Sequence, residues 1–183
     1  YPARIEHPGK NHVRLLQAMK RMIARGEGSH DLVFVGKADR RHEEVLREIS
    51  RLRLEPYVRW KGFVETQELC RLYRAASAVV FPSLYEGFGL PIIEAFQFRT
   101  PVACSDIPVF REISGDAAWY FNPLSEESIA ETLMQFCYSS EQERSERLRR
   151  SSTIADRFDW DRTAQETLDV LLAASRAPAP GGS

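Results

Sequence analysis

The stretch 78–96 combines three local sequence patterns that together restrict the folds that the chain can adopt. A short apolar run at 78–81 is followed by a loop with two glycines, and an apolar segment then opens at Pro91. Gly87 and Gly89 allow a positive φ and a close approach of the backbone to a ligand, and proline suits the first position of a helix. The stretch therefore predicts a strand, a loop and a helix in direct succession.

The loop and the predicted helix start suit an anionic ligand. A helix start directs free N–H groups and the positive end of the helix dipole toward the preceding loop. Glu86 lies in the loop and Glu94 in the expected first turn, so both are placed to face one crevice. Carboxylates accept hydrogen bonds from hydroxyls, which favours a ligand with phosphates between sugars. Two ordinary acids at a helix start are the alternative.

Strand-like and helix-like segments alternate along the rest of the chain. Strands are predicted at 32–35, 58–60, 78–81, 101–104 and 117–121, and helices at 11–25, 41–52, 66–75, 108–113 and 126–138. This alternation indicates an α/β fold with a doubly wound (Rossmann-like) parallel sheet of about six strands, the first at 1–5, and with helices on both faces. Ligands of such sheets bind outside the carboxyl ends of the strands.

The carboxyl-terminal part predicts further helices. Residues 141–174 are helical in pattern, and the expected anchors are Phe158, Trp160, Leu168, Leu171 and Leu172. Asp159-Trp160-Asp161 looks like the paired aspartates that bind a metal ion in some sugar-transferring enzymes. A helical pattern follows directly, so an N-cap at Asp159 or Asp161 is favoured over a metal site. The segment 177–183 has the composition of a linker or disordered tail.

Composition limits the function classes. The 183-residue chain has 25 basic and 26 acidic residues, so it offers no general basic surface to nucleic acid. Its 43% hydrophobic content suits one compact domain, expected at 1–176. The three cysteines show no paired framework, which favours a reducing compartment. No apolar run reaches the roughly 20 residues that cross a bilayer.

Two cations follow the first predicted strand. Arg4 and Lys10 are expected at the same sheet edge as Glu86. On spacing alone they either neutralise a diphosphate in the shared crevice or are solvated surface charges. Residues 9–11 do not form the phosphate loop of the nucleotide hydrolases, because the upstream glycine and the hydroxyl residue after the lysine are absent.

The residues Tyr85-Glu-Gly-Phe-Gly-Leu-Pro-Ile-Ile-Glu94 closely resemble the Glu-x7-Glu signature of the retaining nucleotide-sugar glycosyltransferases of group 1 (family four), which have the GT-B architecture. Further similar segments are 4–11, 32–36, 58–64, 100–105 and 115–118, and the resemblance covers about residues 1 to 174. One departure is the bulky segment 97–99, where the family often has glycine.

In that family two doubly wound domains face each other, and this chain is similar to the C-terminal, donor-binding one. The resemblance implies that the chain is part of a longer protein and lacks the N-terminal acceptor domain. By analogy, the final helices cross back in part to that domain, with their apolar side exposed in this chain.

The resemblance implies a role for each candidate residue. Arg4 and Lys10 would stabilise the leaving diphosphate and Glu86 would bind hydroxyls of the donor sugar, so these three form the implied catalytic set. The implied donor contacts are Gly36, Val64, Gly87, Phe88, Gly89, Leu90 and Glu94. Of these, Glu94 would hold the ribose, and the base would lie near Val64 and Gly36. No metal ion and no cofactor is implied, since the two cations replace the metal ion.

The implied function is transfer of a hexosyl group from a nucleoside-diphosphate sugar to a glycan, lipid-linked or other acceptor, with this chain alone inactive. Two alternatives stay open: a non-catalytic module that binds a nucleotide or sugar phosphate, and another GT-B enzyme such as an epimerase or a phosphorylase. The expected partners are the sugar nucleotide and, through the missing domain, the acceptor, but no nucleic acid. The expected location is cytoplasmic, and peripheral association of the full-length enzyme with the cytoplasmic membrane face is left open.

Overall fold

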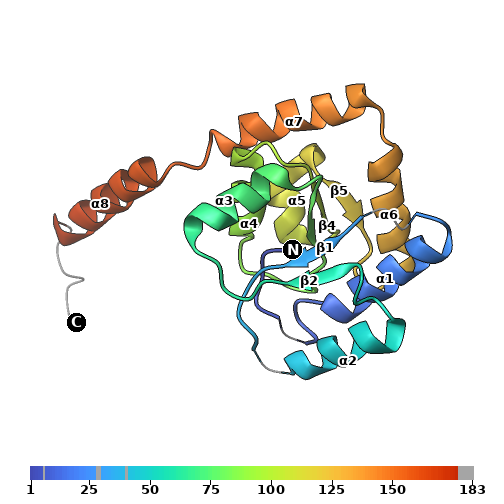
Figure 1. Ribbon diagram of the computed structural model, residues 1–183. Coiled ribbons are helices and arrows are strands. Elements are labelled where there is room, and N and C mark those ends of the chain that lie inside the picture. Colours follow the sequence, from blue (N-terminus) through green and yellow to red (C-terminus); the bar gives the residue numbers. More distant parts are fainter. Residues whose placement is uncertain (6, 28–29, 40, 177–183) are drawn as a thin grey trace.

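The computed structural model describes residues 1–5, 7–27, 30–39 and 41–176, and the predicted tail 177–183 lies outside these ranges. Parallel strands alternate with helices along the chain (Figure 1), so the expected α/β class is confirmed. The elements are α1 (His12–Ala24), β1 (Leu32–Phe34), α2 (His42–Leu52), β2 (Val58–Trp60), α3 (Thr66–Ala75), β3 (Val79–Phe81), α4 (Leu90–Gln97), β4 (Val102–Ser105), α5 (Pro108–Ser114), the 3-10 turn η1 (Gly115–Ala117), β5 (Trp119–Phe121), α6 (Glu126–Tyr138), α7 (Glu141–Ala155) and α8 (Trp160–Arg176).

The described strands form two parallel sheets, whereas the sequence predicted one sheet of about six strands. One sheet pairs β1 with β2, and the other has the order β3-β4-β5. Residues 1–5, predicted as the first strand, pair with the chain around β1 only through the parallel bridges Pro2–Val35 and Ile5–Ala38. A cavity that Val33 and Val80 help to line separates β1 from β3, so the backbones of these two strands do not pair.

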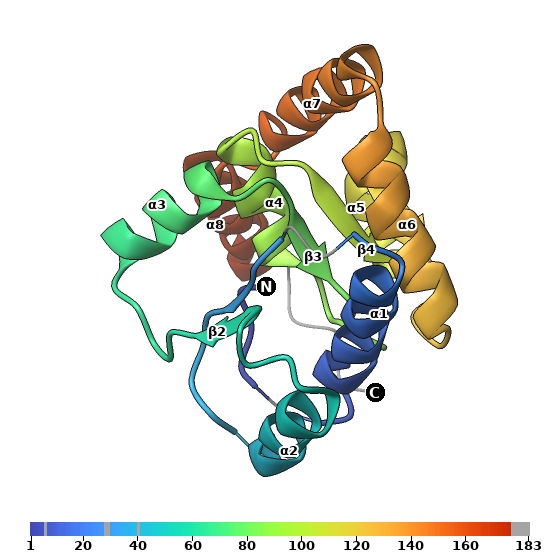
Figure 2. The ribbon, with the colours of Figure 1, turned by 45° about the vertical axis from the view of Figure 1, so that its right-hand side comes forward.

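Helices cover both faces of the three-stranded sheet, as a doubly wound fold requires. Helix α6 contacts β4, β5 and α1, whereas α4 contacts β3, β4 and α7. Figure 2 shows α1 and α6 on one side of the strands and α4 on the other. Strands β3 and β4 are buried along their whole length, because a parallel sheet covered on both faces leaves neither face to solvent. Phe34, Phe96, Phe110 and Phe121 are among the largest buried side chains.

The last helix, α8, extends away from the rest of the fold (Figure 1). The Asp159 carboxylate accepts a hydrogen bond from the Arg162 N–H at 3.0 Å, so Asp159 caps α8 as predicted. Of the predicted anchors, Phe158 packs edge-on against Phe88. Anchor roles for the other four are wrong within this chain, because Trp160, Leu168, Leu171 and Leu172 are 78, 49, 61 and 44% exposed. In the described ranges, no helix has both the length and the apolar content to cross a membrane.

The amino group of Tyr1 is buried beside the cavity. It donates a hydrogen bond to the Val33 carbonyl oxygen at 2.8 Å, and the Tyr1 ring contacts the rings of His12, Phe34 and Phe81. Burial lowers the pKa of this amino group from 8.0 to about 5, because a low-dielectric environment disfavours the charged form. The folded chain therefore holds this amine largely neutral at pH 7.

We predict that the free energy of unfolding of the 183-residue chain increases as the pH rises from about 5 to 8.0. In this window the unfolded amine binds a proton and the folded amine does not, so a higher pH favours the folded state. The full effect is about 4 kcal/mol, at about 1.4 kcal/mol per pKa unit. Urea titrations at about pH 5.5 and pH 8 of the free and the Nα-acetylated chain measure it. Equal pH dependence in the two chains would contradict the prediction.

Candidate functional site

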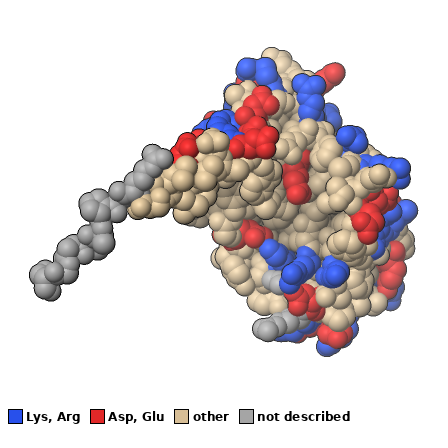
Figure 3. Space-filling view, turned by 90° about the vertical axis from the view of Figure 1, so that its left-hand side faces the viewer, with Lys and Arg blue, Asp and Glu red and all other residues tan. Residues whose placement is uncertain are grey.

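Loops from different parts of the chain meet at the carboxyl ends of the strands. The Leu84 N–H after β3 donates to the Gly9 carbonyl oxygen at 3.0 Å, and the Gly36 N–H after β1 donates to the Gly62 carbonyl oxygen at 2.8 Å. Figure 3 shows the face beside α8, on which basic and acidic side chains surround a hollowed area. The candidate residues therefore share one end of the fold, where ligands of parallel sheets bind.

Lys10 and Glu86 form the centre of the candidate site. The Lys10 Nζ lies 2.7 Å from the Glu86 Oε1, and the two side chains are only 25% and 15% exposed. A charge-assisted hydrogen bond of this length is short and strong. The structure thus brings together one cation and one carboxylate from loops that are far apart in sequence.

Arg4 points to another partner. Its guanidinium Nη1 lies 3.0 Å from the Asp39 Oδ2, and the Arg4 side chain is 73% exposed. The structure therefore pairs Arg4 with Asp39 rather than with Lys10 or Glu86. The diphosphate-binding role inferred for Arg4 stays a prediction.

The two glycines of the loop differ in conformation. Gly89 caps α4 with a φ of 115°, and a Cβ there would lie 3.1 Å from the Phe110 Cε1, so backbone and packing both favour glycine. Gly87 does not adopt a positive φ, and that expectation is wrong. A Cβ on Gly87 would meet no heavy atom within 4 Å, so this position is open to a ligand. Pro91 is the second residue of α4, which begins at Leu90.

The remaining donor-binding candidates lie in the loops that follow β1, β2 and β3 or at the start of α4. Phe88 and Leu90 are 44 and 50% exposed. Val64 is half-buried in the loop that follows β2. Gly36 accepts a hydrogen bond from the Trp60 indole N–H at 2.8 Å, and a Cβ on Gly36 would lie 2.1 Å from the Ala3 carbonyl oxygen. The turn after β1 thus needs glycine at position 36, because residues 1–5 pack directly against its backbone.

Glu94 contacts Tyr73, a residue that the sequence reasoning missed. Glu94 is the fifth residue of α4 and lies in its second turn, not in the first turn as expected. The Tyr73 hydroxyl donates to the Glu94 Oε2 at 2.6 Å. Burial and this carboxylate raise the pKa of Tyr73 well above its usual value, so the hydroxyl stays a donor at neutral pH. In the sequence, Tyr73 is one more apolar position of a predicted helix, which carries no signal for this contact.

Asn11 is a second residue that the sequence reasoning missed. Its amide Nδ2 donates to the Pro82 carbonyl oxygen at 2.9 Å and to the Pro123 carbonyl oxygen at 2.8 Å, and the side chain is buried. Its φ is 58°, a conformation that asparagine tolerates better than most residues. Asn11 therefore fixes the turn that carries Lys10 to the loops that follow β3 and β5. The available signal was an asparagine immediately before a predicted helix.

The polar groups of the site suit an anion that also carries hydroxyls. Lys10 supplies a positive charge, Glu86 supplies hydrogen-bond acceptors, and the start of α4 supplies the positive end of a helix dipole. Among the described residues, no group of three or more His, Cys, Asp or Glu side chains is arranged to hold a metal ion.

Comparison with known proteins gives a family match over most of the chain. The family described as "Glycosyl transferases group 1" matches residues 1–153. The chain is 30% identical over 163 residues to O-antigen chain mannosyltransferase B of Escherichia coli, and the alignment covers 89% of this chain and 42% of that protein. It is 38% identical over 114 residues to O-antigen chain mannosyltransferase RfbU of Salmonella typhimurium, and this alignment covers 62% of this chain and 31% of that protein. The chain thus spans less than half the length of these curated relatives.

Solved structures share the fold at low sequence identity. An alpha,alpha-trehalose-phosphate synthase (UDP-forming) from Burkholderia vietnamiensis superposes with a TM-score of 0.84 at 17% identity, over 94% of this chain and 44% of that one. A sucrose-phosphate synthase from Thermosynechococcus elongatus gives a TM-score of 0.81 at 21% identity, over 94% and 44% of the two chains. At these identities the likeness concerns the fold alone.

We predict that Asn11→Ala destabilises the chain. The substitution leaves the Pro82 carbonyl oxygen without the buried amide donor and leaves the Pro123 carbonyl oxygen with the Arg14 Nη1 donor at 3.2 Å, which costs about 2–3 kcal/mol of unfolding free energy. Asn11→Gly is the matched control, because glycine adopts the positive φ freely and removes only the side-chain contacts. Urea denaturation of both variants measures the effect. A loss below about 0.5 kcal/mol in both would show that Asn11 does not hold these loops.

Proposed function

This chain belongs to the group 1 glycosyl transferases, and on that basis we propose that it is the donor-binding part of a retaining enzyme that transfers a hexosyl group from a nucleoside-diphosphate sugar. The observation that carries the proposal is the Lys10–Glu86 pair, which sets a cation and a hydrogen-bond acceptor 2.7 Å apart at the strand ends. A diphosphate requires the cation and sugar hydroxyls require the acceptor. A sugar nucleotide presents both groups in one molecule.

Donor binding is proposed to exchange the partners of this pair. Lys10 turns to the diphosphate and stabilises the charge that develops as it leaves, while Glu86 accepts hydrogen bonds from the sugar. The positive end of the α4 dipole is directed at the phosphates. Arg4 joins them by leaving Asp39, which is a small cost because the Arg4 side chain is 73% exposed and exposed ion pairs contribute about 1 kcal/mol or less.

The nucleoside is proposed to lie along α4 and the turn after β1. The Tyr73 hydroxyl donates a hydrogen bond to the Glu94 Oε2 and so orients the carboxylate. The Glu94 Oε1 then accepts hydrogen bonds from the ribose hydroxyls. The base lies near Val64 and Gly36, beside the exposed surface of the β2 loop. In this arrangement Tyr73 is a positioning residue that acts through Glu94.

The acceptor site is proposed to lie outside this chain, which spans less than half the length of its curated relatives. The proposed acceptor is a glycan or a lipid-linked glycan, and the proposed location is the cytoplasm or its membrane face. Lys10 and Arg4 are proposed to stabilise the negative charge of the diphosphate in place of a metal ion. Mannose is the first sugar to test, because both relatives are mannosyltransferases by name.

A non-catalytic module that binds a sugar nucleotide is the second candidate. The Arg4–Asp39 ion pair favours it, because one of the two cations is held away from Lys10. Measurable sugar transfer by a longer protein that contains this chain would exclude this candidate.

Lys10→Ala is predicted to weaken the binding of nucleoside diphosphates to the 183-residue chain by about 10- to 100-fold, as expected for a hydrogen bond to a charged group. Binding of the uncharged nucleosides should not change. Calorimetric titrations with GDP, UDP, ADP and GDP-mannose measure the effect, and Lys20→Ala on α1 is the matched control. In a longer, active protein the same variant should lose about 2–4 kcal/mol of transition-state stabilisation. Unchanged diphosphate affinity would remove Lys10 from the site.

Tyr73→Phe is predicted to reduce the affinity for the preferred ribonucleoside diphosphate about 3- to 10-fold, the worth of one hydrogen bond. The aromatic ring that stacks on Phe98 is kept, so the fold should be preserved. A 2′,3′-dideoxynucleoside diphosphate lacks the ribose hydroxyls and should bind both chains equally. Equal weakening for the two ligands would mean that Tyr73 is only structural.

A further inference from the structure

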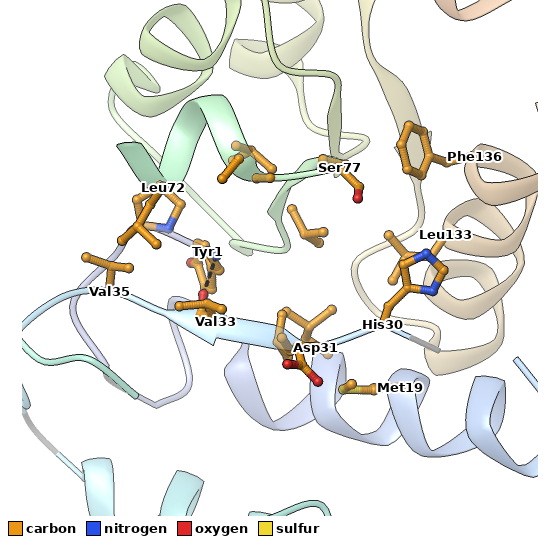
Figure 4. Close-up of a pocket in the computed structure, with 18 of the residues that line it drawn as sticks. Tyr1, Met19, His30, Asp31, Val33, Val35, Leu72, Ser77, Leu133 and Phe136 are labelled. Atoms are coloured by element: carbon orange, nitrogen blue, oxygen red, sulfur yellow. Dashed lines mark hydrogen bonds between the residues drawn. The ribbon is translucent and has the colours of Figure 1, made fainter. Parts of the chain in front are cut away.

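Two pockets of the described chain have linings of opposite character. The cavity of about 550 Å³ between β1 and β3 is lined mostly by apolar side chains, among them Leu72, Leu133 and Phe136 (Figure 4). A second pocket, of about 370 Å³, lies beside β5, and its lining includes three arginines and one carboxylate, namely Arg111, Arg147, Arg150 and Asp116. This arginine pocket suits an anion rather than an apolar group.

Consecutive elements from α5 to α7 build the arginine pocket. Arg111 comes from α5 and Asp116 from η1, whereas Arg147 and Arg150 come from α7. The two arginines of α7 are three positions apart, so they lie on the same face of that helix. None of the described lining residues is a candidate of the donor site, so the arginine pocket is separate from the Lys10–Glu86 pair.

Aromatic rings of β5 hold two of the guanidinium groups in place. The Arg147 Cζ lies 4.4 Å from the centroid of the Trp119 ring, and the Arg111 Cζ lies 3.7 Å from the centroid of the Tyr120 ring. The Arg147 Nη1 also donates to the Ala118 carbonyl oxygen at 2.8 Å. Such contacts restrict the two side chains before any ligand binds, so less side-chain freedom is lost on binding.

The ion pairs around the arginine pocket leave donors for a further acceptor. Arg111 bonds to Asp106 through Nε and Nη2, and Arg150 bonds to Glu146 through Nε. A guanidinium has five N–H groups, so both side chains keep others. The Arg150 Nη1 lies 4.0 Å from the Asp116 Oδ2, and the Asp116 side chain is 83% exposed. This distance is too long for a hydrogen bond, so Asp116 competes only weakly with a bound anion.

Trp119 gives an independent indication that the arginine pocket takes an acceptor. The residue is 3% exposed and lines the pocket. Its indole Nε1 is buried and has no hydrogen-bond partner among the described residues. Buried donors are paired in the great majority of cases, because a donor that is removed from water without a partner is costly. An oxyanion in the pocket offers an acceptor of the kind that this donor lacks.

We propose that the arginine pocket binds a small, free phosphate monoester, whose phosphoryl oxygens accept hydrogen bonds from Arg111, Arg147 and Arg150. A phosphoryl group has three terminal oxygens, so it can meet donors from several directions. A carboxylate has only two oxygens and satisfies fewer of these donors. The amide of Gln135, which also lines the pocket, is available to the organic part of the ester. The proposal goes beyond sugar transfer and does not depend on the donor site.

The test is a titration of the ¹⁵N-labelled 183-residue chain with glycerol 3-phosphate at constant ionic strength, followed by NMR at the tryptophan indole N–H signals. The substitutions Trp60→Phe and Trp160→Phe, at two exposed positions, identify those signals and so the signal of Trp119. The Trp119 signal should shift and saturate with a Kd of about 1 mM or lower, whereas the Trp160 signal should not move. A Trp119 signal that does not saturate by about 20 mM would overturn the proposal.

Charge variants make the test specific to the arginine pocket. Arg150→Gln should weaken binding about 10-fold, as expected for a hydrogen bond to a charged group. Arg149→Gln on the same helix is the matched control, because Arg149 is outside the described lining. Asp116→Asn removes a competing charge and should strengthen binding about 3- to 10-fold. Equal affinities of the Arg150→Gln and Arg149→Gln chains would overturn the proposal.

Two further measurements separate the arginine pocket from other sources of phosphate binding. The Trp119 titration should be unchanged in the Lys10→Ala chain, and its loss there would assign the ligand to the donor site and overturn the proposal. Vesicles of phosphatidic acid and phosphatidylcholine present the same phosphoryl group on a lipid. Sedimentation of the chain with these vesicles that is lost in Arg150→Gln would overturn the assignment to a free ligand.

Discussion

A parallel strand can be joined to its neighbour only by a crossover of about a dozen residues or more, and every pairing in this structure follows that requirement. Helices α2, α4 and α5 make the crossovers between the paired strands. Because the strands run in one direction, the loops that follow them come to one end of the fold. Lys10 and Glu86 meet there although they belong to different loops. The position of the candidate site is thus a result of strand direction.

Each of the charged candidate residues at that end of the fold has a specific polar partner. Glu86 pairs with Lys10, Glu94 accepts from the buried Tyr73, and Arg4 pairs with Asp39. Buried or half-buried carboxylates need such partners because desolvation of a charge is costly. The two acids therefore have different environments: Glu86 lies beside the Lys10 cation, whereas Glu94 accepts a hydrogen bond from a neutral hydroxyl.

The sequence by itself determined the local elements, because periodicity and capping act over a few neighbouring residues. Helices α3 and α6 begin and end at the predicted residues, and Asp159 caps α8 as predicted. The glycine-rich loop and the family resemblance indicated the class of ligand. Only the tertiary structure decided the contacts of Tyr73 and Asn11 and the division into two sheets. These features join segments that are distant in sequence, and their partners depend on packing that no local pattern encodes.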